Sequence, residues 1–492
     1  MMSTNSNQES QATTSGNLAP WTTGDLPAPP PFTIRNLFRT IGPGAILLAG
    51  SIGGGEWLVG PTITVKYGLD ILWIATVAIV LQLLFNLEAI RYTLYTGEPI
   101  LVGIMRLRPG SRFWASGYIF ATIAQLGVPA LAAGCASVLF AAFAGHIAGA
   151  GDATYLSYLT YVVILVTVGI LLSGKTIERM LEYFSWAMIA FIFSFLIVVN
   201  VLFVPLEHWL KTLSGFFQFG RLPADIDILL LAAFAATAGS GGIGNLVITN
   251  WYRDKGFGMG SRVGSISSAF SHSEVQLSAT GQVFPITDEN LQNWRSWWKY
   301  VSADQIWLWG MGCLVGMFLN VNLATAVIPE NTEMDHMAAG AFQARYMAEH
   351  LWSGFWWLAL LNGFWVLMST HLSNTDVLIR TVTDIVWVAS PQVRERRRMN
   401  ISRLYYFFLT LATIWGLLAV NWGHALSLFK ILGAVAGPVL AIAAVQILIV
   451  NTRLLPEELR PHLWRRGALI LCAICYGCLS LALLWDLYLS LR

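Results

Sequence analysis

The sequence predicts an all-α membrane protein with two inverted repeats of five transmembrane helices and an additional eleventh helix. Of the 492 residues, 56% are hydrophobic and only 11% are charged, whereas about 25% of residues are charged in an ordinary soluble domain. The mean hydropathy is +0.61. Eleven apolar segments are long enough to cross a bilayer. Glycine clusters interrupt the first and the sixth of these segments, which is the pattern that indicates two repeats.

The apolar segments divide the chain into four parts. Residues 1–36, rich in Ser, Thr, Asn, Gln and Pro, are expected to form a disordered cytoplasmic tail. Residues 37–210 hold the first five spans, residues 225–452 the second five, and residues 465–492 the eleventh. The limits of the spans are Ile41–Lys66, Leu69–Tyr95, Phe113–Gly145, Tyr155–Leu172, Leu181–Val204, Ile226–Trp251, Val301–Ala326, Gly354–Val377, Leu404–Val420, Leu426–Val450 and Gly467–Leu489.

The basic residues predict the orientation of the spans. If the N-terminus is cytoplasmic, six of the 29 Lys and Arg residues fall on the outer side, which leaves 23 on the inner side. This asymmetry agrees with the positive-inside rule and with an odd number of spans. We therefore expect an integral, multi-pass protein of a bacterial-type plasma membrane, in contact with the lipid bilayer and with no role in nucleic-acid binding.

The two glycine clusters predict interrupted helices at the centre of the membrane. Interrupted helices at matching positions of inverted repeats mark the binding site of many transporters. Glycine lets a chain unwind and approach a ligand closely, and unpaired backbone groups survive in a membrane only where they line a cavity or are buried in protein. Close helix packing is the alternative use of such glycines. The predicted substrate-binding residues are Gly53, Gly54, Gly55, Glu56, Gly239, Ser240, Gly241, Gly242 and Asn245.

Glu56 is the charged residue of this predicted site. A carboxylate near the bilayer centre is costly and is a functional hypothesis by default. It also has a structural interpretation, because an acidic residue at the start of a half-helix caps backbone amides and offsets the helix dipole. The two roles are compatible, since capping would hold the carboxylate in place.

Several motifs resemble those of the Nramp family of divalent metal transporters. They are Gly42–Gly44 ("GPG") before the first helix break, Thr96–Gly97 ("TG") five residues after Arg91, and Leu378–Trp387 ("LIRTVTDIVW"). The similarity covers roughly residues 37–453. It implies a LeuT-type fold of the APC superfamily, eleven or twelve spans, and proton-coupled import of manganese or iron.

The signature residues of that family are replaced in this chain. Gly53 stands at the position of the family's metal-binding Asp, and Glu56 at the position of its Asn. In the sixth span, Gly239, Ser240 and Gly241 replace the family's Met-Pro-His, which removes the soft thioether ligand that favours transition metals. No Asp or Glu occurs between Arg112 and Asp152, where the family has its third-span acids.

Two substrate classes fit these residues. One is a hard, partly hydrated divalent cation of the Mg²⁺ or Mn²⁺ type, held by Glu56 as the metal ligand together with backbone carbonyls. The other is a small organic amine or zwitterion, whose ammonium group pairs with Glu56 while the ring of Trp57 adds a cation–π attraction. A third hypothesis is a sensor or scaffold that uses the same fold without transport.

Other sequence features exclude or leave open further functions. The chain contains no phosphate-binding P-loop, no HExxH zinc motif and no GxSxG elbow, so we expect a secondary transporter, not an enzyme, and no cofactor. In the eighth span, five polar residues have the spacing to line the cytoplasmic exit path, namely Ser369, His371, Asn374, Asp376 and Arg380. Asp376 and Arg380 have the spacing of an i,i+4 ion pair, which is the interpretation we favour for them.

Overall fold

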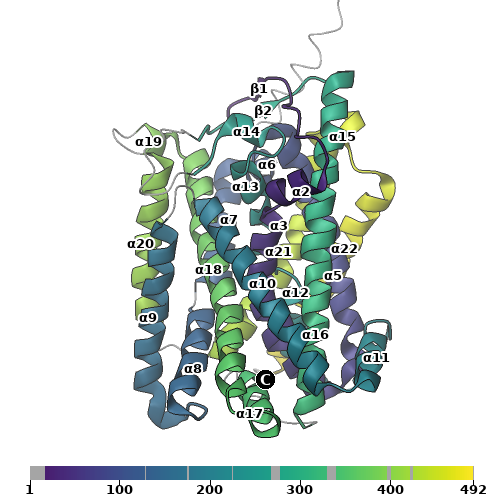
Figure 1. Ribbon diagram of the computed structural model, residues 1–492. Helices are drawn as coiled ribbons and strands as arrows, with labels where there is room; N and C mark the ends of the chain where they lie inside the picture. Colours follow the sequence, from purple (N-terminus) through teal and green to yellow (C-terminus); the bar gives the residue numbers. More distant parts are fainter. Residues whose placement is uncertain are drawn as a thin grey trace, which may run out of the picture.

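The computed structural model describes residues 17–490 apart from residues 128, 174–176, 224, 267–276, 330–338, 396–399 and 421–424. The described chain is almost entirely helical (Figure 1). Its only strands are β1 (Thr22–Thr23) and β2 (Gln282–Val283), which pair in parallel at one end of the helix bundle. The residues that the sequence assigns to the membrane lie in long helices between the two ends.

The first five predicted spans are all helical. In chain order they are α3 (Pro43–Ser51) with η1 (Ile52–Val59) and α4 (Gly60–Tyr67), then α5 (Trp73–Thr96), α7 (Ser111–Leu126) with α8 (Ala130–Ala144), α9 (Ala153–Leu172) and α10 (Ile177–Phe203). The third span contains two helices, since α7 ends at Leu126 and α8 begins at Ala130, which the sequence analysis did not predict.

The next six predicted spans are also helical. They are α12 (Ile228–Thr237) with α13 (Ile243–Asp254), then α15 (Asp288–Ser302) with η4 (Ala303–Gly310) and α16 (Met311–Val327), α18 (Phe355–Ala389), α20 (Ile401–Ala419), α21 (Ala425–Arg453) and α22 (Leu463–Ser490). The seventh and eighth spans extend well beyond their predicted limits, because α15 begins at Asp288 and α18 ends at Ala389.

Length and apolarity identify most of these helices as membrane spans. Within the described residues, eight helices are long and apolar enough to cross a membrane. The first span is a ninth if the preceding α2 (Ile34–Thr40) and the helix that follows it, which meet at a bend, are counted together as one span. The other two predicted spans are the divided pair α12 and α13 and the more polar α18.

Shorter elements cover the two ends of the bundle. The end with β1 and β2 also carries α2, α6 (Ile100–Met105), α14 (Gly260–Val263) and α19 (Pro391–Arg394), and the opposite end carries α11 (Leu206–Gly215) and α17 (Ala339–His350) (Figure 1). Three further short helices are η2 (Leu69–Ile71), η3 (Ala150–Asp152) and η5 (Glu457–Leu459). The C-terminal end of α22 lies at the end of the bundle away from β1 (Figure 1).

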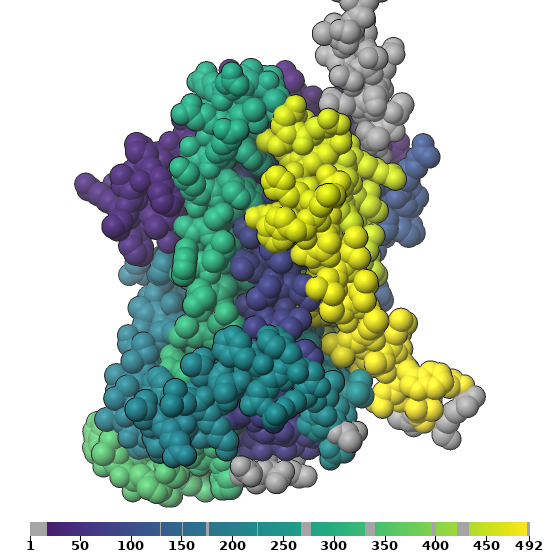
Figure 2. Space-filling view, turned by 90° about the vertical axis from the view of Figure 1, so that its right-hand side faces the viewer, coloured from purple at the N-terminus to yellow at the C-terminus, as the bar shows by residue number. Residues whose placement is uncertain are grey.

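Two helices show how the bundle is built around its centre. Helix α18 contacts α3, α7, α8 and α10, so it runs through the interior of the protein. Helix α22 instead packs on α21 and α5 and lies on the outer surface (Figure 2). The eleventh helix is therefore added to the side of the two repeats.

The described part of the N-terminal tail is ordered, which corrects the prediction of a disordered segment for residues 17–36. Leu26 is 3% exposed, and its backbone amide donates to Asn290 Oδ1 at 3.1 Å. Trp297 donates from its indole nitrogen to the carbonyl of Pro27 at 2.8 Å. The low apolar content of the tail predicted disorder, but contacts with α15 compensate for it. Residues 1–16 lie outside the described part of the chain.

Candidate functional site

The first glycine cluster does not unwind its helix, contrary to the sequence prediction. Helices α3, η1 and α4 follow one another without a gap, and η1 is a π-helix over Ile52–Val59. At its end the Gly60 amide donates to the carbonyl of Gly55, five residues earlier. A π-turn keeps backbone groups paired, which costs less in a membrane than exposing them. Short π-helical segments are frequent at functional sites.

The glycines of η1 permit close approach to two other helices. A Cβ atom on Gly55 would lie 2.0 Å from the backbone oxygen of Thr237, at the end of α12. A Cβ atom on Gly53 would lie 2.4 Å from Oγ1 of Thr370 on α18, which also accepts a hydrogen bond from the Gly53 amide at 2.9 Å. The glycine cluster therefore serves close packing at the crossing of the first span with α12 and α18.

The second glycine cluster is a true break, as predicted. Helix α12 ends at Thr237 and α13 begins at Ile243. Three residues between them have positive φ angles, which are 120° at Gly239, 66° at Gly241 and 64° at Gly242. Side chains with a Cβ atom rarely adopt these angles, so glycine is needed here.

Two glutamine side chains satisfy most of the backbone groups that this break releases. Oε1 of Gln82 on α5 accepts hydrogen bonds from the amides of Ser240 (3.0 Å) and Gly241 (3.2 Å). Nε2 of Gln82 donates to the carbonyls of Ala236 (3.1 Å) and Ala238 (3.3 Å), and to the hydroxyl of Tyr476 on α22.

Gln125 on α7 has the same role at the other side of the break. It donates to the carbonyl of Gly241 at 2.8 Å and accepts from the amide of Ile243 at 3.1 Å. In this structure the freed backbone groups of the break are paired with the two glutamines. The energetic reason is that an unpaired buried amide or carbonyl costs about 1–3 kcal/mol, and the glutamines remove that cost.

Glu56 lies at the centre of the crossing and is completely buried. In the described part of the chain, neither of its carboxylate oxygens has a hydrogen-bond partner. The Cys313 thiol of α16 and the Gly239 backbone amide are close enough to interact electrostatically with the carboxylate, but without hydrogen-bond geometry. The proposed capping of a half-helix by Glu56 is therefore not seen, since the helix here is continuous.

A small polar cluster joins the first span to the break. The hydroxyls of Ser51 and Ser240 are 2.8 Å apart, and the indole nitrogen of Trp309 on η4 lies 3.1 Å from Ser240 Oγ and 3.3 Å from Ser51 Oγ. Trp57, which the sequence placed beside the substrate, instead packs toward Gly340 on α17 and Gly363 on α18. Trp309 is the aromatic ring at the crossing.

Asn245 is buried in a different group of side chains. Its amide nitrogen donates to Asn86 Oδ1 at 2.9 Å, and Asn86 donates in turn to Gln305 at 3.1 Å. The Oδ1 atom of Asn245 has no partner among the described residues. Of the predicted site residues, those of the two glycine clusters and Glu56 thus meet at the crossing, whereas the partners of Asn245 lie on α5 and η4.

Helix α18 holds the first span through a row of hydroxyl groups. Ser369 and Thr370 both donate to the carbonyl of Ala49, at 2.9 and 3.1 Å, and Ser373 donates to Ile46 at 3.3 Å. The Asp376–Arg380 ion pair is present as expected, with Nε of Arg380 2.8 Å from Asp376 Oδ2. These contacts make α18 a fixed support for the π-helical segment.

Sequence analysis missed Gln82, Gln125, Cys313 and Asp304. Asp304 on η4 accepts the amides of Gly42 (3.0 Å) and Gly44 (2.7 Å), and thereby caps the first span. A single amide or acid inside an otherwise apolar run was the available signal for three of these residues. The sequence does not show which backbone such a side chain reaches, because its partners are more than 100 positions away.

Structure comparison identifies the fold. No family model matches the sequence, and no curated protein sequence matches it. The manganese transporter of Eremococcus coleocola, in complex with an aromatic bis-isothiourea substituted compound, is similar with a TM-score of 0.59 and 15% identity over 93% of this chain and 89% of that chain. The chain has the LeuT fold.

Further solved structures are also similar to this chain. Single-residue mutants of the Eremococcus coleocola transporter are similar with a TM-score of 0.59 and 15% identity, over 94% of this chain and 89% of that chain. The nucleobase-cation-symport-1 family transporter MHP1, in a closed conformation with bromovinylhydantoin bound, has a TM-score of 0.49 and 13% identity over 90% of this chain.

Proposed function

We propose that the protein is a secondary transporter of a small cation and that Glu56 is its charged contact. The observation that carries this proposal is the carboxylate of Glu56, which is completely buried and has no hydrogen-bond partner in the described chain. An ionisable group inside a membrane is costly and is usually retained for function. A cation that enters the crossing would supply the missing partner.

The surrounding structure supports alternating access as the mechanism. Glu56 lies between the first span and the broken α12–α13 pair, the place where LeuT-type transporters bind their substrates. The contact of Gly55 with Thr237 closes this place in the present structure. For a substrate to enter, the first span and α12 have to separate, which corresponds to the rocking of one helix group against another.

A divalent metal ion of the Mg²⁺ or Mn²⁺ type is the first candidate substrate. The fold is shared with a manganese transporter, and this supports a Nramp-like protein. The described residues contain no group of three or more His, Cys, Asp or Glu side chains that would hold a metal ion. A metal would therefore bind through Glu56 and retained water, which suits a hard cation better than a transition metal.

A small organic amine or zwitterion is the second candidate, and the same scarcity of ligands favours it. One carboxylate is sufficient to pair with one ammonium group, and the ring of Trp309 lies at the serine cluster of the crossing. An aromatic ring attracts an ammonium group that lies over its face. A sensor or scaffold without transport is the third hypothesis.

The charge distribution supports an orientation with the N-terminal segment in the cytoplasm. Arg106 directly follows α6, at the end of the bundle that carries β1 and β2, and pairs there with Glu98. Labelling of single cysteines introduced at Arg39 and Lys211 with an impermeant maleimide in whole cells tests this orientation, and we expect only the second to react.

Uptake into proteoliposomes tests the proposed function. We expect purified protein to move Mg²⁺ and Mn²⁺, or members of a panel of amines and amino acids, and the Glu56→Gln variant to move the same substrate at least tenfold more slowly. Glu207→Gln, on the exposed face of α11, is the matched control and should behave as wild type. Equal uptake by Glu56→Gln and wild type would overturn the site. A protein with no uptake and no ligand-dependent thermal shift would support the sensor hypothesis.

A further inference from the structure

A cavity lies away from Glu56, between helices of the third, fourth, eighth, ninth and tenth spans. It has a volume of about 70 Å³, and residues of α7, α8, α9, α18, α20 and α21 line it. The cavity forms where the third span is split, because Gly127 and Pro129 belong to its wall. Helices α9 and α20, which form one side, expose most of their surface to the surroundings of the bundle.

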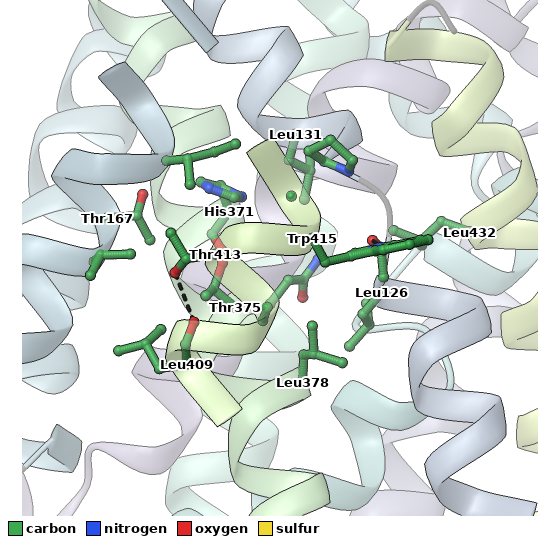
Figure 3. Close-up of a pocket in the computed structure, with 17 residues that line it drawn as sticks. Leu126, Leu131, Thr167, His371, Thr375, Leu378, Leu409, Thr413, Trp415 and Leu432 are labelled. Atoms are coloured by element: carbon green, nitrogen blue, oxygen red, sulfur yellow. Dashed lines mark hydrogen bonds between the residues drawn. The ribbon is translucent and has the colours of Figure 1, made fainter. Parts of the chain in front are cut away.

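The wall of this cavity is apolar except for one imidazole and a few neutral polar groups. Figure 3 shows His371 of α18 near Thr167 of α9 and Thr413 of α20, with Trp415 and Leu432 on another side. None of the lining residues is Asp, Glu, Lys or Arg. A charged ligand would therefore have no counter-ion, and burying it would cost far more than burying a neutral molecule.

The hydroxyl groups of the wall already donate to backbone carbonyls. Thr167 donates to Val163 at 2.9 Å, Thr413 to Leu409 at 2.7 Å and Thr375 to His371 at 2.8 Å. Their oxygens keep the capacity to accept. The indole nitrogen of Trp415 donates to the carbonyl of Gly127 at 2.8 Å, so this polar group at the split of the third span is paired as well.

Nε2 of His371 is different from these groups. This nitrogen is buried. Among the buried side-chain nitrogen and oxygen atoms of the described wall, it alone has no hydrogen-bond partner. A neutral imidazole nitrogen either donates or accepts, according to the tautomer. A hydroxyl group is able to satisfy it in both cases, because a hydroxyl both donates and accepts.

We propose that this cavity binds the hydroxyl end of a neutral, mostly apolar molecule, and that His371 forms the hydrogen bond to it. An engineered cavity of about 150 Å³ holds one benzene molecule, so the cavity here has room for a group of roughly three heavy atoms. The rest of the ligand would extend between α9 and α20 toward the bilayer. A free alcohol and a lipid with a hydroxyl head group, such as diacylglycerol, share this chemistry.

Photolabelling of the full-length protein in detergent tests this proposal. The probe is a hexanol that carries a diazirine, and the labelled peptides are found by mass spectrometry. We expect saturable labelling in α9 and α20 that hexanol suppresses and hexane does not. Suppression by hexane to the same extent would overturn the assignment of a hydroxyl site.

Two variants and one control separate binding from loss of structure. His371→Phe removes the nitrogen, and we expect about fivefold weaker apparent affinity, which is the loss of one hydrogen bond. Gly416→Ala narrows the cavity, and its new methyl group would lie 3.7 Å from Ile164, an ordinary contact. It should also weaken labelling. Thr410→Val, on the exposed face of α20, should label as wild type. Unchanged labelling of His371→Phe would overturn the proposal.

The source of the ligand is decided in nanodiscs of phosphatidylcholine with and without diacylglycerol. Protection of the same peptides by diacylglycerol would support a lipid as the ligand. Protection by hexanol alone would support a free alcohol. If neither protects, the proposal fails. These measurements follow binding and not uptake, so their outcome is independent of the transport proposed for Glu56.

Discussion

Glu56 and Glu98 are both enclosed by the protein, yet their surroundings are opposite. Glu98, in the loop after α5, is 3% exposed and receives hydrogen bonds from Arg106, Tyr92 and the Gly281 amide. Glu56, in the middle of the first span, is 0% exposed and receives none in the described chain. Burial alone therefore does not show whether a carboxylate is paired within the fold.

The two carboxylates differ in whether the protein itself supplies their hydrogen-bond partners. Glu98 joins the end of α5 to α6 and to the segment before β2, and Arg106 also donates to the carbonyl of Ala19 at 3.0 Å. Its partners are all built into the fold. Glu56 lacks a partner at a place where Gln82 and Gln125 satisfy the neighbouring backbone. Among the described residues, Glu98 is thus paired within the fold, whereas the carboxylate of Glu56 is not.

The largest expected effect on stability is that of Glu98→Gln. This substitution removes the partner of the buried Arg106 guanidinium. Breaking a buried ion pair from one side costs about 3–5 kcal/mol. Denaturation of the purified protein, followed by tryptophan fluorescence, should show a decrease of this size in the free energy of unfolding. A variant as stable as wild type would contradict the structural role of Glu98.

Acidification should reduce the stability that the Glu98 carboxylate contributes to the fold. Burial raises the pKa of Glu98, but the charge and hydrogen bonds of Arg106 outweigh this and hold the pKa below its ordinary value of 4.5. The unfolded state then binds the proton more readily. The stabilisation is complete above about pH 4.5 and is lost as the pH falls through the lower, folded pKa.

Thermal unfolding of wild type and Glu98→Gln across pH 3 to 7 measures this effect. We expect the difference between their melting temperatures to be constant from pH 7 to about pH 5 and to narrow below that range. A difference that grows toward acid would have the wrong sign for a lowered pKa.

Gln82→Leu tests how much the pairing of the backbone near Glu56 contributes to stability. Leucine leaves the amides of Ser240 and Gly241 without their acceptor, and each unpaired buried group costs about 1–3 kcal/mol. We expect a loss of stability in that range, measured in the same denaturation assay. Gln292→Leu, on the exposed side of α15, is the matched control and should change little.

Glu56→Gln should have the smallest effect on stability, although it has the largest effect on the proposed uptake. Glutamine removes a buried carboxylate that no group in the described chain pairs with, so the free energy of unfolding should stay the same or rise. A loss comparable with that of Glu98→Gln would show that Glu56 is a structural residue and would remove the contrast between the two sites.

The sequence by itself determined the class of the fold and the place of the second helix break. Hydropathy located the helices, because a span of about 30 Å needs a long apolar run whatever its neighbours are. Glycine at positions 239, 241 and 242 marked a real break, since the positive φ angles there are a local property of the chain.

Only the tertiary structure decided what the two glycine clusters do. At Gly53–Gly55 the partner helices α12 and α18 approach so closely that a wide, continuous π-helix replaces the expected gap. At the second break, Gln82 and Gln125 arrive from distant parts of the chain and pair with the backbone. Such pairings depend on which helices become neighbours, and a single sequence carries no local signal for that.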